Sequence, residues 1–334
     1  MARPTLKDVA DRVGVSAKTV SNVVNGTGWV TAELRERVQV ALVEVGYRPN
    51  AAARQLRSGR SGMIALAVPE LSQPYFAELA ASLVREAQGR LITVLVNQTD
   101  GLADVERKIS EGIGATAVDG IILSPLALSA SDLEGRRDST PLVLLGEHIG
   151  TSTFPHVTVD NTAAAKAATQ HLLSIGCRRI AAIGAQDHGP NETALLRLAG
   201  YRAALEEAGI PVDESLILTV DGFHRADGAR AARTILGTGL EPDGIFAFND
   251  LLALGAMHAL STANVRVPDD IAVIGFDDIE EGQYSTPTLS SVSPNTGELV
   301  ATAIDLLLAQ PPEPGMHTVG FTIAHRGSTK GPAQ

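Results

Sequence analysis

The hydrophobic and polar positions of the first fifty residues repeat with the period of helices. Apolar side chains recur three or four positions apart in residues 6–13, 17–25 and 32–45, as on the buried face of an amphipathic helix. Each segment is short and each has one apolar face only. We therefore predict a small three-helix unit, in which the first two helices and the turn between them form a helix-turn-helix.

Residues at the ends of these segments favour the same boundaries. Thr5 can cap the first helix, and Asp8 completes a capping box with it. Ser16 can cap the second helix in the same way. Gly14 and Gly46 permit the left-handed backbone on which a helix ends. The spacing thus predicts where each helix begins and ends.

An alanine-rich segment follows the three helices. Asn50 is a suitable cap and Gly59 a suitable end, so residues 51–58 are predicted to form a helix. A helix of about seven or eight residues is too short to be stable alone in water. It is expected to fold when a partner buries it, and a flexible tether is the alternative.

From residue 61 onwards, short apolar runs alternate with helical segments. The predicted strands are residues 63–68, 91–96, 120–123, 141–145, 157–159, 179–183, 216–220, 244–248, 271–276, 290–293 and 318–322. The predicted helices include residues 76–88, 162–175, 192–208, 225–236, 251–263 and 297–309. Such alternation predicts an α/β fold with two doubly wound parallel sheets. A ligand is expected between the two lobes, at the carboxyl ends of the strands.

Charge separates the two parts of the chain. The net charge of the 334 residues is -11, but the first sixty hold ten basic and five acidic residues, which gives +5 there and leaves -16 beyond. A basic head on an acidic body is expected when only the head contacts phosphates, although clustering by chance is the alternative. No apolar run reaches the length of about 18 residues that spans a bilayer. The single cysteine, Cys177, suits a reducing compartment, so we expect a cytoplasmic protein without membrane contact.

A helix pair alone is weak evidence, because helical hairpins are common. The specific signal is an ordered set of motifs over fifty residues: Thr5-Leu6-Lys7-Asp8-Val9-Ala10, Gly14-Val15-Ser16, Thr19-Val20-Ser21, Val23-Val24-Asn25 and Gly46-Tyr47-Arg48-Pro49-Asn50. This set resembles the lactose-repressor family of bacterial transcription regulators. The resemblance implies a homodimer that binds near-palindromic operator DNA through its helix-turn-helix.

The resemblance also implies which residues of the head contact DNA. Ala17, Lys18 and Asn22 correspond to the base-reading positions of the second helix. Many family members carry arginine where this chain has Asn22, which leaves the operator sequence open. Contacts to the DNA backbone are expected from Thr5, Ser16, Thr19, Ser21, Asn25, Asn50 and Ala53. For Thr5 and Ser16, the capping role alone would explain the residue.

In the same resemblance, the alanine-rich segment is a hinge helix. Leu56 is then the apolar side chain that enters the minor groove beside its dimer mate and kinks the DNA. The implied domains are the head at 1–49, the hinge and linker at 50–60 and the sensor at 61–334. Lobe one of the sensor is expected at about 61–159 and 290–322, and lobe two at about 160–289.

The sensor resembles the same family and, more loosely, periplasmic sugar-binding proteins. The residues that the resemblance places at an effector are Tyr75, Phe76, Glu147, Arg197, Phe223, Asn249 and Asp277. Aromatic rings would lie against a sugar, and the arginine fork would hold adjacent hydroxyls. Asp250 and Asp278 are expected to be helix caps. Gly146 stands where relatives often have an aspartate and Pro294 where glutamine is frequent, so Glu147 is the candidate replacement and the effector stays open.

Two other classes of function, an enzyme and a transporter's binding protein, fit parts of the sequence. Asp277 and Asp278 could be paired catalytic carboxylates, but adjacent residues project differently from the chain. The eight histidines show no metal-ligand spacing on a helix, and neither a phosphate-binding P-loop nor a nucleophile motif is present, so we expect no enzyme, cofactor or metal. A transporter's solute-binding protein would explain the body but not the head. The sequence thus predicts a repressor released by a sugar, with a non-sugar or corepressor ligand as the alternative.

Overall fold

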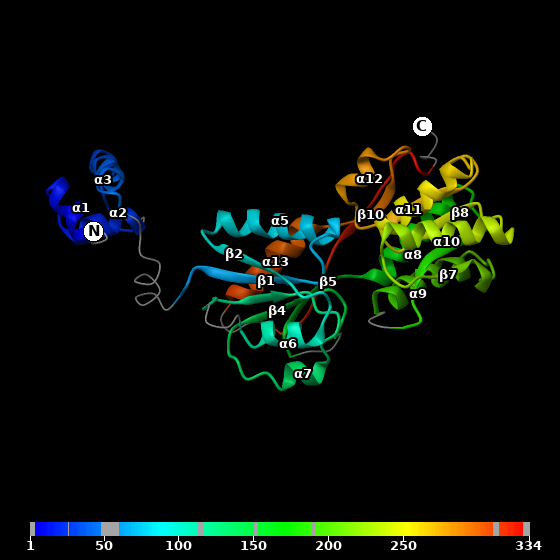
Figure 1. Ribbon diagram of the computed structural model, residues 1–334, viewed down its shortest axis with the longest axis horizontal. Coiled ribbons are helices and arrows are strands. Elements are labelled where there is room, and N and C mark those ends of the chain that lie inside the picture. The colour runs from blue at the N-terminus through cyan, green and yellow to red at the C-terminus, as the bar shows by residue number, and fades with distance from the viewer. Residues whose placement is uncertain are drawn as a thin grey trace. The chain divides into compact units, whose positions relative to one another are not determined.

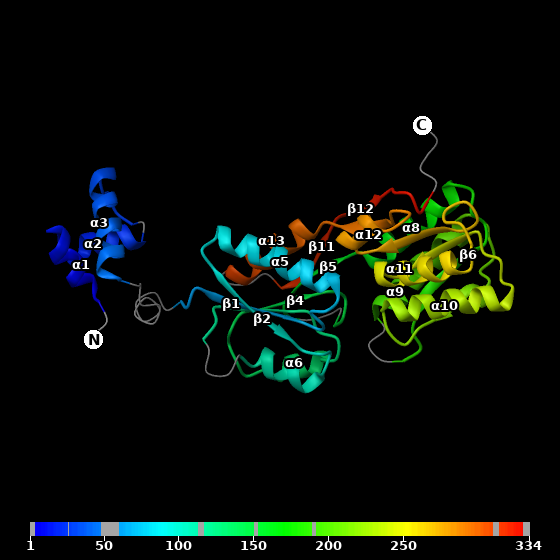
Figure 2. The ribbon, with the colours of Figure 1, turned by 45° about the horizontal axis from the view of Figure 1, so that its top comes forward.

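The computed structural model describes residues 4–25, 27–47, 60–112, 117–149, 153–188, 192–309 and 314–329. The chain divides into two compact units, residues 1–61 and residues 62–334, each of which is described by itself. Figures 1 and 2 show the helical first unit and the α/β second unit. In the part of the chain that the structure describes, no helix is long and apolar enough to cross a membrane.

The first unit is the predicted three-helix head. Its helices are α1 (Leu6–Val13), α2 (Ala17–Asn25) and α3 (Ala32–Val45). Thr5 and Asp8 form the expected capping box, and Gly14 ends α1 at φ 77°. The Ser16 hydroxyl accepts a hydrogen bond from the Thr19 N–H at 3.1 Å at the start of α2. The three apolar faces meet in one small core that includes Val9, Val20 and Val38.

The first sheet of the second unit is parallel throughout, in the order β11-β5-β4-β3-β1-β2. Its strands are β1 (Met63–Val68), β2 (Thr93–Gln98), β3 (Ile121–Leu123), β4 (Leu142–Leu145), β5 (Pro155–Val159) and β11 (Gly315–Val319). Helices α5 (Pro74–Gly89) and α13 (Thr296–Leu308) cover one face, and α6 (Ala103–Ser110) and α7 (Ala130–Glu134) lie on the other (Figures 1 and 2). Alternate residues of β1 accordingly belong to two separate cores, Ile64 and Leu66 to one and Ala65 and Ala67 to the other.

The second sheet has the order β12-β10-β9-β8-β6-β7, with only the edge strand β12 antiparallel to its neighbour. Its strands are β6 (Ile180–Ala185), β7 (Ile217–Thr219), β8 (Gly244–Ala247), β9 (Ala272–Phe276), β10 (Ser290–Pro294) and β12 (Phe321–Ala324). Its helices are α8 (Asn161–Ser174), α9 (Glu192–Glu207), α10 (Arg225–Thr238), α11 (Asp250–Thr262) and the short α12 (Glu280–Tyr284), and a turn of 3-10 helix spans Glu214–Leu216.

The lobe boundaries near the carboxyl end differ from those expected. β10, predicted for lobe one, pairs with β9 in the second sheet. The single strand predicted at 318–322 is two strands, β11 in the first sheet and β12 in the second. The reason lies in the pairing on either side of Gly320: the residues before it pair with β5 and those after it pair with β10, so the chain passes from one sheet to the other there. The chain also passes between the lobes after β5 and after β10.

Helices α10 and α11 approach each other closely through two glycines. A Cβ atom on Gly228 would lie 2.0 Å from the Leu252 carbonyl oxygen, and one on Gly255 would lie 1.9 Å from the Arg225 carbonyl oxygen. Only glycine leaves room for backbone at these distances. The contact holds the amino-terminal ends of both helices side by side, next to the loops that follow β7 and β8.

Candidate functional site

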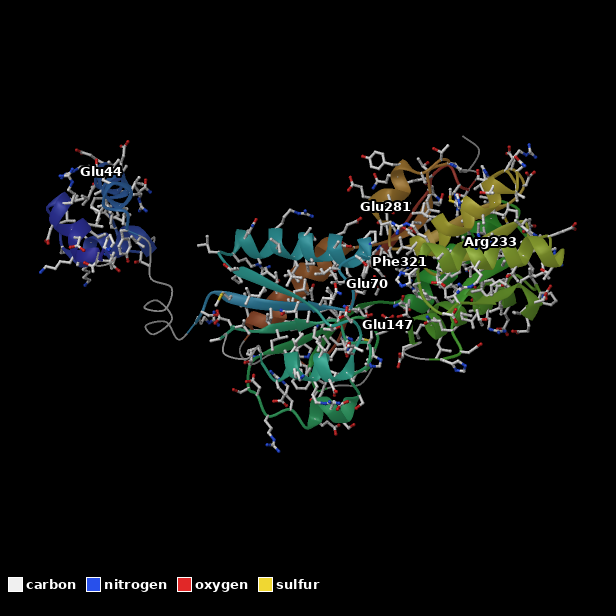
Figure 3. All side chains as sticks on the ribbon, in the orientation of Figure 1. Glu44, Glu70, Glu147, Arg233, Glu281 and Phe321 are labelled. Atoms are coloured by element: carbon white, nitrogen blue, oxygen red, sulfur yellow. The ribbon has the colours of Figure 1, made fainter. Side chains whose placement is uncertain are left out.

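A cavity of about 500 Å³ lies within the second unit, where the carboxyl ends of strands from both sheets meet. Its wall includes all seven residues predicted for the effector: Tyr75, Phe76, Glu147, Arg197, Phe223, Asn249 and Asp277. Figure 3 labels Glu147 and Glu70, a further residue of the wall, in the region where the two lobes meet. The volume suits a small molecule.

Arg197, on α9, is the central cation of this cavity. Its side chain is buried, and its Nε–H donates to Asn161 Oδ1 at 2.8 Å. A second nitrogen donates to the carbonyl oxygen of Phe248. The guanidinium carbon lies 3.5 Å from the ring centroid of Phe276, a cation–π contact. Arg197 therefore supports the end of β8 and the start of α8 as well as facing the cavity.

Asp277 follows β9 directly, in a backbone conformation that is unusual for an aspartate, with φ at 108°. Burial, together with the nearby Glu147 carboxylate, raises the pKa of Asp277 to about 7, although Arg197 opposes the rise. The distance from Arg197 Nη2 to Asp277 Oδ1 is 3.8 Å, too long for a hydrogen bond. Among the described residues the Asp277 carboxylate has no hydrogen-bond donor, so its acceptor capacity is open to a ligand.

Glu147 joins the two lobes at the cavity. It follows β4 in lobe one, and it accepts hydrogen bonds from Asn161 at 3.1 Å and from the Thr193 hydroxyl, both in lobe two. Burial raises the pKa of Glu147. Because Asn161 also accepts from Arg197, a continuous chain of polar contacts connects Glu147 to Arg197. Asn161 was not singled out from the sequence as an effector residue.

Aromatic rings border the same cavity. Tyr75 and Phe76 begin α5, and their ring centroids lie 5.1 Å apart in an edge-to-face arrangement. Phe223 lies across from them in lobe two, and its carbonyl oxygen accepts a hydrogen bond from Asn249 Nδ2 at 3.1 Å. The Asn249 oxygen accepts from the Leu252 N–H at 2.9 Å, which makes Asn249 the cap of α11. Its amide is thus already engaged at both ends.

Two predicted helix caps are wrong. Asp250 lies inside α11 and is buried, and its carboxylate accepts from the Ile279 N–H at 2.9 Å and from the Ser291 hydroxyl at 2.6 Å. Asp278 forms an ion pair with Arg326 at 2.6 Å. Asn249 is the actual cap, because its backbone is extended while Asp250 already has the helical conformation. At the start of α8 the cap is Asp160, whose side chain accepts from the Ala163 N–H at 2.9 Å.

Two carboxylates that the sequence did not single out contribute to the cavity: Glu70 lines its wall, and Glu106 supports the loop that places Leu126 there. Glu70 follows β1, and its carboxylate lies 3.9 Å from His224 Nε2 of lobe two. Glu106 on α6 is buried and accepts from the backbone N–H groups of residues 126–128, which holds the loop after β3 in place. The described residues contain no cluster of three side chains suited to a metal ion. The position of Glu70 shortly after a predicted strand is the sequence signal that could have identified it as a cavity residue.

The wall of the cavity is acidic. The carboxylates are Glu70, Asp100, Glu147, Glu192, Asp221 and Asp277. Against these six, the wall holds one guanidinium, Arg197, together with histidines 148, 188 and 224. A phosphate or carboxylate group on a ligand would therefore meet net repulsion here, since an anion needs a surplus of cations or N–H donors. Hydroxyl groups meet acceptors instead.

In the head, the predicted DNA-contacting side chains lie along α2 and at its start. Ala17 and Lys18 are exposed, and Asn22, Thr19 and Ser21 are half-buried. The Ser16 hydroxyl lies 2.9 Å from that of Thr19. The predictions for Asn50, Ala53 and Leu56, and for the side chain of Asn25, lie outside the described residues.

Comparisons with known proteins agree with both units. Residues 5–50 match the model of bacterial regulatory proteins of the lacI family, and residues 169–329 match that of the periplasmic binding protein-like domain. The ribose operon repressor of Halalkalibacterium halodurans is 35% identical over 98% of this chain and 97% of its own length. Among solved structures, the transcriptional regulator CelR in complex with cellobiose is 30% identical with a TM-score of 0.69, covering 98% of this chain and 100% of that one. The lac repressor dimer bound to operator and the anti-inducer ONPF is 26% identical with a TM-score of 0.81, covering 98% and 99%.

Proposed function

This chain belongs to the lacI family of bacterial regulatory proteins and is a DNA-binding transcription regulator, and we propose that it is a repressor released from its operator by an uncharged sugar. The family is one of regulators, not of enzymes. The proposed domains are the head at 1–49, the hinge at 50–60 and the sensor at 61–334. Because it acts on the chromosome, we place it in the cytoplasm.

The observation that carries the sugar proposal is the convergence of seven residues on one cavity. Aromatic rings, a guanidinium and a carboxylate without a donor are the groups that a polyol needs. The acidic wall disfavours phosphorylated or acidic sugars and leaves neutral ones. Two relatives support a sugar as the class of effector, since one is named a ribose operon repressor and another is described in complex with cellobiose.

We propose that the protein acts as a homodimer, as the lac repressor does in its operator complex. A two-fold dimer presents two heads to two half-sites of a near-palindromic operator. The sensor also exposes several large apolar side chains on lobe one, namely Leu71, Leu91, Val96 and Leu102. These exposed side chains are where we propose that a second copy makes contact.

A ligand in the cavity would act on contacts that already join the lobes. Glu147 accepts from Asn161 and Thr193 across the cavity, and Glu78 on α5 accepts from the Glu280 N–H of α12 at 2.9 Å. We propose that the effector favours a different arrangement of these contacts and thereby separates the hinges of the dimer. Operator affinity then falls because the two states differ in affinity for DNA.

A ligand screen by thermal unfolding tests the sugar proposal. Ribose, glucose and cellobiose are each compared with the phosphorylated form of the same or a related sugar. We expect at least one uncharged sugar to raise the melting temperature of the wild-type protein and to leave that of Asp277→Asn unchanged. Stabilisation by phosphorylated members alone would contradict the uncharged class, and the absence of any response to uncharged carbohydrates would contradict the sugar proposal itself.

The head offers a prediction that separates base reading from backbone contact. Asn22→Ala is expected to cost roughly 1–3 kcal/mol of binding free energy at particular base pairs and to flatten the preference there, because an amide pairs with base edges. Thr19→Ala is expected to weaken binding to operator and to random DNA by similar factors. Selection of binding sites from random libraries measures both effects. A uniform loss for Asn22→Ala would remove it from the base-reading residues.

Effector binding is expected to depend on pH through Asp277. Its pKa of about 7 lies above the ordinary 3.8, and the ionised carboxylate is the form that accepts hydrogen bonds from hydroxyls. Binding then releases a proton, so the association constant should rise with pH and should fall by roughly tenfold per unit below about pH 7. Without ligand, the contribution of Asp277 to the free energy of unfolding should instead fall as the pH rises from 3.8 to about 7. Over this range the folded state binds more protons than the unfolded state, so raising the pH favours unfolding.

Titration calorimetry across this pH range checks the prediction. The asparagine in Asp277→Asn cannot ionise, so this variant should bind too weakly to respond in the ligand screen, and binding measured at higher sugar concentration should not change with pH. A wild-type affinity that does not change with pH would mean that the Asp277 carboxylate does not accept from the ligand.

A further inference from the structure

One large aromatic side chain of the head is left uncovered. Trp29, in the loop between α2 and α3, is 91% exposed, whereas its neighbour Val30 packs against the core of the head. Its indole N–H has no partner among the described residues. Tryptophan carries both a large apolar surface and a donor, and both are usually covered in a functional complex.

The loop holds Trp29 beside the side chain predicted to read bases. The Thr27 N–H donates to the Asn22 carbonyl oxygen at 2.9 Å. A Cβ atom on Gly28 would lie 2.9 Å from Asn22 Nδ2, and Gly28 has φ at 72°. The left-handed conformation favours glycine at this position. The loop therefore folds back onto Asn22, and the residue after Gly28 is Trp29.

Both ends of the loop fix this position. Val30 is anchored in the core, and the Thr31 hydroxyl accepts from the Leu34 N–H at 3.3 Å to start α3. Trp29 is thus the one residue of segment 27–31 whose side chain is large, apolar and exposed. It lies between two neighbours whose positions are fixed, Gly28 against Asn22 and Val30 in the core.

We propose that Trp29 is a DNA-backbone contact of this regulator. The proposal rests on the proposed base reading by Asn22: the indole ring lies against the deoxyribose-phosphate chain next to the base pairs that Asn22 is predicted to read, and its Nε1–H donates to a phosphate oxygen. The indole nitrogen can only donate, and phosphates are the acceptors that border a groove. Since this contact involves no base edge, it adds affinity without sequence preference.

Trp29 is the single tryptophan of the chain, so the tryptophan fluorescence of the full-length protein reports on it alone. The protein is titrated with the duplex that it selects from a random library and with a random duplex of equal length, and acrylamide probes access to the indole. We expect free quenching without DNA and protection in both complexes. Unchanged quenching at saturating operator, or protection already present without DNA, would overturn the proposal; the latter would place a second copy or another part of the chain on the ring.

Substitutions separate the donor from the ring. Trp29→Ala is expected to weaken binding to both duplexes by about tenfold per head, and Trp29→Phe is expected to restore only part of the loss. Because a neutral donor releases no counterion, the slope of log affinity against log salt should not change, whereas loss of a lysine–phosphate contact lowers it by about 1. Val43→Ala removes another exposed apolar side chain of the head and should leave binding unchanged. A loss confined to the operator would make Trp29 a base reader and contradict the proposal.

Discussion

Replacing Arg197 by alanine is expected to abolish the response of operator binding to the effector and to lower the free energy of unfolding of the sensor by about 3 kcal/mol. The loss of response follows from the removal of the central cation of the cavity. The loss of stability follows because Asn161 Oδ1 and the Phe248 carbonyl oxygen are left without their buried donor. The stacking of the guanidinium on Phe276 is lost as well.

Two further variants make this result interpretable. Arg202 lies on the same helix but is only half-buried, and it pairs with the exposed Glu214, so Arg202→Ala should change the free energy of unfolding by less than about 1 kcal/mol and leave the response intact. Arg197→Lys keeps the charge but not the planar fork, and it should recover part of the stability without normal effector affinity. Denaturant unfolding and effector titration measure the two quantities. A normal response in Arg197→Ala would show that the effector does not bind this cavity through Arg197.

Replacing Leu56 by alanine is expected to lower specific operator affinity by about 1.5–3 kcal/mol per subunit and to remove most of the DNA bend. This prediction rests on the family resemblance, because Leu56 lies outside the described residues. In the hinge interpretation, Leu56 fills the base step that opens in the minor groove. Alanine keeps the helix propensity but removes most of the apolar volume. Weak binding to random DNA should persist through the basic residues of the head.

Ala53→Gly provides the contrast for the hinge. Glycine raises the cost of ordering the helix by up to about 1 kcal/mol per subunit but leaves Leu56 in place. The variant should therefore bind the operator more weakly and still bend it once bound. Energy transfer between dyes at the two ends of the duplex measures the bend. A Leu56→Ala protein that bends the operator as the wild type does would remove Leu56 as the wedge.

Local sequence signals were sufficient for the head. The capping pair of Thr5 and Asp8, the cap at Ser16 and the glycine at 14 act within one turn of each helix end, so neighbouring residues determine them. The family resemblance named seven residues at an effector, and all seven line one cavity, in keeping with the predicted place of a ligand at the carboxyl ends of the strands. In a parallel sheet the carboxyl ends of all strands lie at the same edge, so this placement follows from the fold class and does not depend on individual side-chain contacts.

Features that depend on distant contacts were missed or wrongly assigned. Asn249 and Asp250 have similar cap preferences, and only the donors from Ile279 and Ser291 explain why the aspartate is buried inside α11. The sheet to which β10 belongs is set by pairing with β9, which no local pattern encodes. Helix α6 was not predicted, since its sequence Ala103–Ser110 is mostly polar, and its buried Glu106 becomes understandable only from the loop that it holds.

The most direct test of a ligand-controlled DNA-binding regulator is operator affinity with and without the sugar that stabilises the sensor. Fluorescence anisotropy of a labelled operator duplex, titrated with the full-length protein at constant salt and pH, gives both dissociation constants. We expect the saturating sugar to weaken operator binding by about 5–150-fold in the wild type, and to have no effect in Asp277→Asn. Tighter binding with the sugar would make it a corepressor and contradict induction. An unchanged operator affinity, with a sugar shown to occupy the cavity, would contradict the coupling between sensor and head.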